Sequence, residues 1–494
     1  MIARLGSLIL VPLFLRYWSA TRYGEYLALF AAISYLTSLD IGMQQAVINR
    51  LTQAYAKDDF ASYRVVQNTA TTFYVLLAAS VTVLVAALAS FLPLSRWMGL
   101  RLTGVSTATA AIILLAVYVM WSMPMRLISA AYQTTGNLAR TQWIANTQQI
   151  LVVVLSAGVL SLGGGLLSIA FVQVLTVALV SALVFMDLKQ RHRILAPGFS
   201  AARLSALREL AHPSLLFALL LVGNLVAYQG STLVVSATMG GLAVAIVSIS
   251  KAVIDLIRQV LYSITLALSP DFARLEALGQ FESLRRIHRM MVAATGALTI
   301  GLAASVWYEG AQVITVWTRG RIEPDVMLLR LFLVLLVLQT PWAASSTIAT
   351  AANRHKVQAV GYFFAAVLGV ILVALLVQRL GTWAVPLGLI LGEAVGCYHF
   401  VIKATCQIIG EPYAAFALRF WLGFMSVSFV SLATGWVVHN SIGGPMVLRG
   451  VGVTISTVTT AAICGWIIWL SPADRALVIP RLRPALGIST AKAA

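Results

Sequence analysis

Residues 56–64 read AKDDFASYR, and residues 277–285 read ALGQFESLR. Alanine, phenylalanine, serine and arginine recur at the same spacing in both segments. A second repeated pattern is separated by nearly the same number of residues. Asn137, Arg140 and Gln142 in its first copy correspond to Asn353, Lys356 and Gln358 in its second. Two repeated patterns with nearly the same separation along the sequence predict that the chain contains an internal duplication.

The surroundings of these segments are strongly apolar. Of the 494 residues, 60% are hydrophobic and only 10% are charged, and the mean hydropathy is +0.91. Soluble chains carry about 25% charged residues. Apolar runs of about 20 residues, which is the length that spans a bilayer as a helix, recur from end to end. The sequence therefore predicts one all-α polytopic membrane domain.

Apolar runs and loop signals predict about 14 transmembrane helices. The first apolar run is too short and lacks the cleavage site of a signal peptide, so we interpret it as a helix whose true start could lie upstream. The predicted helices cover residues 2–18, 24–46, 68–93, 105–130, 142–162, 165–186, 213–236, 241–268, 290–308, 326–350, 358–378, 381–403, 414–438 and 446–470.

Six helices separate the two copies, so both copies face the same side of the membrane. This predicts a parallel repeat of two pseudo-symmetric six-helix lobes, an arrangement typical of transporters, with a substrate site at the lobe interface. A duplicated scaffold without a transport role is the alternative. The predicted parts are an N-terminal lobe (1–186), a cytoplasmic linker (187–212), a C-terminal lobe (213–403) and two additional helices with a basic tail (404–494).

The net charge of +18 lies mainly in short loops. With the N-terminus in the cytoplasm, the inner loops hold roughly 22 Lys and Arg and the outer loops roughly 7. Both termini are therefore predicted to be cytoplasmic. This distribution argues against nucleic acid as a partner and favours anionic membrane lipids.

Residues 249–259, ISKAVIDLIRQ, place three charges in the predicted eighth helix. Lys251, Asp255 and Arg258 share one helical face about 14–24 Å along the helix. Each charge at such depth costs roughly 2.5–3.5 kcal/mol, so this face is expected to meet a wet cavity or the other lobe. We expect Lys251 to pair with Asp255, leaving Arg258 uncompensated on the wall of an anion-binding cavity. A structural ion-pair network is the alternative.

The predicted second helix is the repeat partner of the eighth and is polar in its inner half. Asp40 and Gln44 share one face, and Gln45 and Asn49 share another. Arg50 at the inner mouth would suit a pyrophosphate, because a guanidinium binds two oxygens at once. Snorkelling to the membrane interface is the alternative for Arg50.

Glu393 lies inside the predicted twelfth helix, where a carboxylate is a functional candidate by default. It could carry a coupling proton, or it could be a structural group bonded to a neighbour. The three cysteines, Cys397, Cys406 and Cys464, have no metal spacing and are interpreted as apolar fillers. No nucleophile elbow, HExxH or Walker motif occurs, so neither an enzyme nor a metal or cofactor site is expected.

Several diffuse segments, in order and at consistent spacing, resemble Wzx-type polysaccharide flippases of the MOP superfamily. The resemblance covers most of the chain. It is carried by PLFL at 12–15, YGEY at 23–26, YLTSLDIG at 35–42, AKDD at 56–59, QGS at 229–231, MG at 239–240 and LSPDFARL at 268–275.

This resemblance implies two six-helix lobes, alternating access and an undecaprenyl-pyrophosphate-linked oligosaccharide as cargo in the bacterial inner membrane. It also implies a cationic central cavity, mainly from helices one, two, seven and eight, which agrees with the interpretation of Lys251, Arg258 and Arg50. A polysaccharide polymerase and chain-length machinery are the protein partners that such a role suggests.

Three alternatives remain at the level of sequence. A drug or cation antiporter of the same superfamily should have an acidic cavity, whereas the charges here are basic. A peptidoglycan-precursor flippase would be mechanistically similar. A membrane glycosyltransferase or ligase would normally need a large outer loop, and the longest outer loop runs only over about residues 308–325.

The asymmetry of basic loops gives a testable topology. Reporter fusions after Arg193 and after Arg483 should both report the cytoplasm, and a fusion after Gly320 should report the periplasm. Alkaline phosphatase and green fluorescent protein activities measure this directly. The same side for Arg193 and Gly320 would show that the predicted helix count is wrong.

Overall fold

Helices make up most of the computed structural model, which describes residues 2–40, 43–135, 137–191, 195–203, 205–207, 215–351, 354–443, 445–472 and 475. No β-strand occurs among these residues, so the predicted all-α fold is confirmed. The described ranges leave out about a third of the predicted linker, nearly all of the basic tail, and Asn353 of the second repeated pattern.

The chain gathers into two compact units. The first contains residues 1–248, with the short segments 317–322 and 377–382, and the second contains the remainder from Ile249 onward. The lobe boundaries predicted from the sequence follow the internal repeat and stay a prediction.

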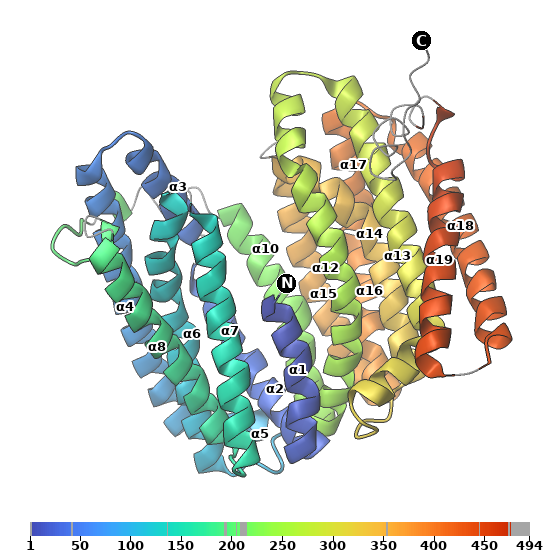
Figure 1. Cartoon of the computed structure of the whole chain (residues 1–494). Helices are drawn as coiled ribbons and strands as arrows, with labels where there is room; N and C mark the ends of the chain where they lie inside the picture. Colours follow the sequence, from blue (N-terminus) through green and yellow to red (C-terminus); the bar gives the residue numbers. More distant parts are fainter. Residues whose placement is uncertain are drawn as a thin grey trace. The chain divides into compact units, whose positions relative to one another are not determined.

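The first unit contains the helices of the N-terminal half, among which α4, α6, α7 and α8 run side by side (Figure 1). Its elements are α1 (Ile2–Tyr17), α2 (Ala20–Ser34), the 3₁₀ helix η1 (Tyr35–Asp40), α3 (Met43–Ala56), α4 (Phe60–Phe91), α5 (Leu94–Trp97), α6 (Val105–Thr134), α7 (Leu138–Ser161), α8 (Leu166–Arg191), α10 (Leu215–Leu225), the π-helical turn η4 (Val226–Gly230) and α11 (Ser231–Met239).

A 37-residue helix, α12 (Gly241–Ala277), begins in the first unit and continues into the second. The second unit also contains the two helices that lie outside the predicted repeat, α18 and α19, which pack on each other. Its further elements are α13 (Phe281–Trp317), α14 (Val326–Ala351), most of α15 (Lys356–Leu380), α16 (Ala384–Gly396), α17 (Tyr398–Ile409), α18 (Tyr413–Ser441) and α19 (Met446–Ile468). The end of α15 and most of the 3₁₀ helix η5 (Gly381–Trp383) belong to the segment 377–382 of the first unit.

Ten helical segments of the described residues are long and apolar enough to cross a membrane, which is the pattern of a multi-pass membrane protein. The count of 14 stays a prediction. With 16 and 15 residues, α1 and α2 are shorter than the about 20 residues that a span needs. The segment Lys356–Gly396 counts once among the ten, although it contains two of the predicted helices.

The duplicated sequence forms the same turn in both copies. After α3, Asp58 has φ 54°, and after α12, Gly279 has φ 66°. In each copy an amide then donates five residues back, from Asp59 N to Ala54 O and from Gln280 N to Leu275 O, both at 3.0 Å. Equal backbone geometry at the two matching positions agrees with the predicted repeat.

The prediction of one continuous helix over residues 24–46 is wrong. This segment breaks into α2, η1 and α3, and residues 41–42 lie outside the described ranges. The hydroxyls of Thr37 and Ser38 donate to the carbonyls of Ser34 and Tyr35, three residues back. Such side-chain bonds compete with the regular helical ladder, and their clustering explains why the helix tightens to 3₁₀ geometry over Tyr35–Asp40.

The packing of α15 against α16 positions the helix that carries Glu393. Small residues face each other along the pair, so the two backbones approach closely, as is common in membranes. A Cβ added to Gly392 would lie 2.4 Å from Ala365 O and 2.8 Å from Gly369 N, and one added to Gly396 would lie 2.7 Å from Gly361 O. Only glycine fits at these contacts.

Gly392→Val should therefore separate α15 from α16 and destabilise the protein by about 1–3 kcal/mol, the usual cost of overpacking. Unfolding in a graded series of sodium dodecyl sulfate concentrations measures the loss. The matched control is Gly158→Val on α7, because a Cβ at Gly158 meets nothing within 4 Å. Equal stability of both variants would contradict the close packing of α15 and α16.

Candidate functional site

The charged face of α12 holds a direct ion pair. Arg258 Nη1 lies 2.5 Å from Asp255 Oδ1, and both side chains are half-buried, with 30% and 39% of their areas exposed. The prediction that Arg258 is uncompensated is therefore wrong. Lys251 also interacts electrostatically with Asp255, which agrees with the predicted attraction between these two residues. An acid three residues before a base is a favourable helical arrangement, and the long arginine side chain reaches back to the carboxylate. Lys251 is half-buried on the same helix.

The second guanidinium nitrogen of Arg258 extends the pair away from α12. Arg258 Nη2 donates to Gln339 Oε1 on α14 at 2.8 Å. Gln339 Nε2 in turn donates to Glu393 Oε1 on α16 at 2.5 Å. The amide thus joins a cation on α12 to a carboxylate on α16, because one amide group offers both an acceptor and a donor.

Glu393 lies at the buried end of this chain of hydrogen bonds. Its side chain is buried, and its second oxygen accepts from Trp342 Nε1 at 3.1 Å. Gln339 and Trp342 are also buried. We call these five residues, Asp255, Arg258, Gln339, Trp342 and Glu393, the α12–α14–α16 network. It runs from a half-exposed ion pair to a buried carboxylate, and all of it belongs to the second unit.

The first unit holds the polar residues predicted on the second helix. Asp40 Oδ1 accepts from the hydroxyl of Tyr74 on α4 and, at 3.3 Å, from Gln44 N. Gln44 Nε2 donates to the carbonyl of Met123 on α6 at 3.2 Å. Arg126, also on α6, lies within electrostatic range of Asp40. Asp40 and Gln44 therefore tie η1 and α3 to α4 and α6.

The structure gives less detail for the other residues predicted on the second helix. Arg50 is exposed on α3, and the side chain of Asn49 lies outside the described residues. The predicted set is thus divided: Asp40, Gln44, Asn49 and Arg50 belong to the first unit, and Lys251, Asp255, Arg258 and Glu393 belong to the second.

Gln339 and Trp342 are absent from the set predicted from the sequence. The sequence feature that could have indicated them is the strongly polar amide of Gln339 within the apolar run 326–350. It lies immediately before Thr340 and Pro341. An amide inside a membrane helix usually bonds to a neighbouring helix. The sequence alone does not indicate which neighbour, because that depends on the rotation of α14 relative to α12 and α16.

No protein-family model matches the chain, and no curated protein sequence matches it. Among solved structures, the lipid II flippase MurJ in an inward closed conformation is similar over 96% of this chain and 98% of its own, with a TM-score of 0.70 and 10% identity. An inward-facing multidrug resistance MATE family transporter of the MOP superfamily is similar over 82% of this chain and 98% of its own, with a TM-score of 0.65 and 18% identity.

A MATE structure in the straight conformation is similar over 83% of this chain and 94% of its own, with a TM-score of 0.59 and 17% identity. These likenesses concern the fold. The chain shares the fold of these MurJ and MATE structures.

The α12–α14–α16 network predicts a stability effect that is independent of function. Gln339→Leu keeps most of the side-chain volume but leaves a buried Glu393 oxygen and Arg258 without the amide between them. The expected loss is about 1–3 kcal/mol, the cost of unpaired buried polar groups, measured by detergent unfolding. Gln378→Leu, at an exposed position on α15, is the matched control. An equal effect of both changes would contradict the network.

Proposed function

We propose that this protein is a flippase that moves a polyprenyl-pyrophosphate-linked oligosaccharide from the cytoplasmic to the periplasmic leaflet of the bacterial inner membrane, for cell-surface polysaccharide biosynthesis. The Wzx-like sequence segments support this cargo. The carrying observation is the near full-length likeness to a lipid II flippase, whereas the MATE likeness covers 82% of the chain.

The α12–α14–α16 network is the group that we assign to the cargo's pyrophosphate. An anion that leaves water needs a compensating cation, and the attraction between charges grows as the effective dielectric constant falls. Arg258 offers a planar fork of donors for phosphate oxygens. Asp255 is half-exposed, so an incoming pyrophosphate competes with this carboxylate for Arg258 while Lys251 adds a second positive charge.

Asp40, Gln44, Asn49 and Arg50 are proposed as further contributors from the first unit. Arg50 is exposed and carries the guanidinium, and Asp40 and Gln44 hold the broken second helix in place. In this proposal Asp40, Gln44 and Asn49 are polar or positioning groups. Arg50 contacts the cargo at the cytoplasmic end of the transport path.

Arg258→Ala should slow polymer export by about ten- to hundred-fold, since a hydrogen bond to a charged group contributes about 1.5–3 kcal/mol. Lipid-linked sugar should accumulate on the inner leaflet. Arg258→Lys should keep part of the activity, because it keeps the charge and loses the fork. Asp255→Asn frees Arg258 and should still support export. Arg330→Ala, on the same unit but stacked on Trp307, is the matched control.

The opposite pattern would identify a structural clamp. If Asp255→Asn and Arg258→Ala lose folded protein equally, and export per surviving molecule is normal in both, the pair does not bind cargo. Surface polymer measured against the amount of folded protein in the membrane separates these results.

Glu393 is proposed as the group that carries a coupling proton. Glu393→Gln preserves the shape of the side chain and removes its charge, so it should abolish transport while the protein still folds and inserts. Normal surface polymer in this variant, at a normal protein level, would reduce Glu393 to a structural group.

Purified protein in liposomes tests the function itself. A labelled polyprenyl-pyrophosphate oligosaccharide should become accessible on the opposite leaflet, with no new glycosidic bond. A new bond would identify a glycosyltransferase or ligase. Export of cationic drugs without movement of the lipid would favour the MATE-like antiporter, which the higher MATE sequence identities make the second candidate. Preferential movement of lipid II would identify a peptidoglycan-precursor flippase.

The remaining parts of the proposal concern the cell. Both termini are proposed to lie in the cytoplasm, as the basic loops predict. Polysaccharide polymerase and chain-length proteins are proposed as partners that receive the flipped cargo. No cofactor is required for the proposed cycle.

A further inference from the structure

A cavity of about 610 Å³ lies in the first unit, at the ends of α6, α7 and α8. It is separate from the α12–α14–α16 network, because every residue that lines it belongs to the first unit. The residues that decide its chemistry are Tyr132, Arg140, Trp143, Thr147, Leu183 and Asp187.

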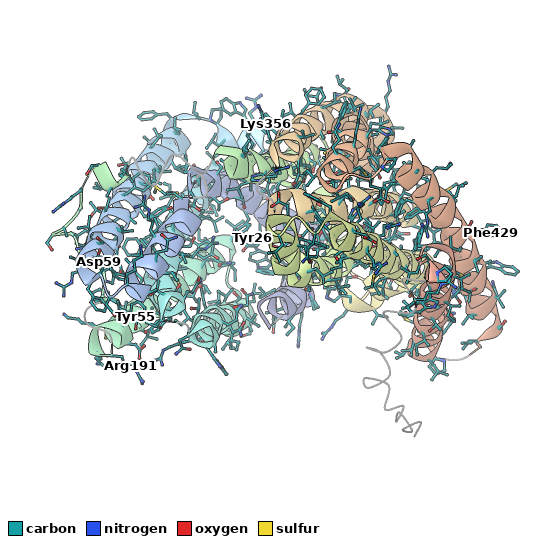
Figure 2. All side chains as sticks on the ribbon, turned by 90° about the horizontal axis from the view of Figure 1, so that it is seen from above. Tyr26, Tyr55, Asp59, Arg191, Lys356 and Phe429 are labelled. Carbon is teal, nitrogen blue, oxygen red and sulfur yellow. The ribbon has the colours of Figure 1, made fainter. Side chains whose placement is uncertain are left out.

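One end of this cavity is cationic. Asp187 Oδ1 accepts from Arg140 Nη2 at 2.6 Å and from Arg191 Nε at 2.9 Å. Asp187 Oδ2 accepts from the hydroxyl of Tyr132, whose ring also lies 5.2 Å from the Arg140 guanidinium. Two guanidinium groups therefore share one carboxylate, which leaves an excess of one positive charge. Arg191 lies at the margin of the first unit (Figure 2).

The other end of the cavity is apolar. The lining changes from charged to mostly apolar over about 10 Å, at 1.5 Å per residue. This change runs from Arg140 to Thr147 along α7 and from Asp187 to Val180 along α8. Trp143 stands between the two ends and is 68% exposed. Tryptophan at such a boundary is typical of the membrane interface.

We infer that this cavity binds an anionic phospholipid, with the headgroup phosphate on Arg140 and Arg191 and one acyl chain along α7 and α8. The charged end lies at the face that the basic loops predict to be cytoplasmic, where basic pockets between membrane helices bind anionic headgroups. A guanidinium has five N–H donors, and Asp187 takes one from each arginine, so a phosphate is bound beside the carboxylate and not in place of it. The apolar end matches an acyl chain, which a free phosphate lacks.

Native mass spectrometry of the full chain, purified in a neutral detergent, measures the binding of dioleoylphosphatidylglycerol against dioleoylphosphatidylcholine. Arg140→Ala and Arg191→Ala should each weaken phosphatidylglycerol binding about five-fold, which corresponds to about 1 kcal/mol per interfacial charge. Asp187→Asn should strengthen it, because it frees both guanidinium groups. Phosphatidylcholine binding should change in none of them.

Two further variants separate binding in the cavity from a general effect of surface charge. Arg64→Ala removes one exposed arginine from the same predicted face, at the start of α4, and should leave the affinity unchanged. Thr147→Trp fills the apolar end without touching the ion pairs and should block binding. If Arg140→Ala does not fold, Arg191→Ala and Thr147→Trp decide the question.

Three results would overturn the inference. An equal loss in Arg64→Ala would reduce the effect to general surface charge. A loss in Asp187→Asn as large as in Arg140→Ala would make the three residues a structural clamp. Displacement of phosphatidylglycerol by an equimolar polyprenyl pyrophosphate would assign the cavity to that lipid.

Discussion

The structure depends on one constraint: an ionised side chain within a membrane helix must find its partners on neighbouring helices. Removing one partner of a buried charge costs several kcal/mol, so each such contact fixes helices in register. Glu393 joins α16 to α14 through Gln339. Buried Glu309 accepts from His439 on α18 at 2.7 Å and from Arg449 on α19 at 3.0 Å. One carboxylate of α13 thus bonds to both helices outside the repeat.

Composition and periodicity predicted the fold well, because the absence of charge over long runs and the repeated turn are both local signals. The turn at Asp58 and Gly279 is an example, since its two copies lie in nine-residue segments that share four residues at the same spacing. The break of the second helix was missed, because the hydroxyls of Thr37 and Ser38 bond to the backbone in a way that hydropathy does not register.

The site was predicted in part. One charged face of α12 was correctly recognised, because helical spacing alone brings Asp255 and Arg258 together. Spacing placed both Lys251 and Arg258 within reach of Asp255, and the structure shows a direct ion pair between Asp255 and Arg258. Gln339 could not be paired with Glu393 from the sequence, since the two lie 54 residues apart and meet through the packing of α14 and α16. The likeness of the fold to MOP transporters adds no residue-level information at 10–18% identity.

A chain of hydrogen bonds from Arg258 through Gln339 to Glu393 joins the proposed anion site to the proposed proton site. A change at one end then alters the partners of the other, and their effects on transport are not independent. The translocation rates of Arg258→Lys, Glu393→Asp and the double variant in liposomes test this most directly. The expected result is a double variant about as slow as the slower single variant. Losses that multiply across the two sites would show that Arg258 and Glu393 act separately and would contradict the central claim.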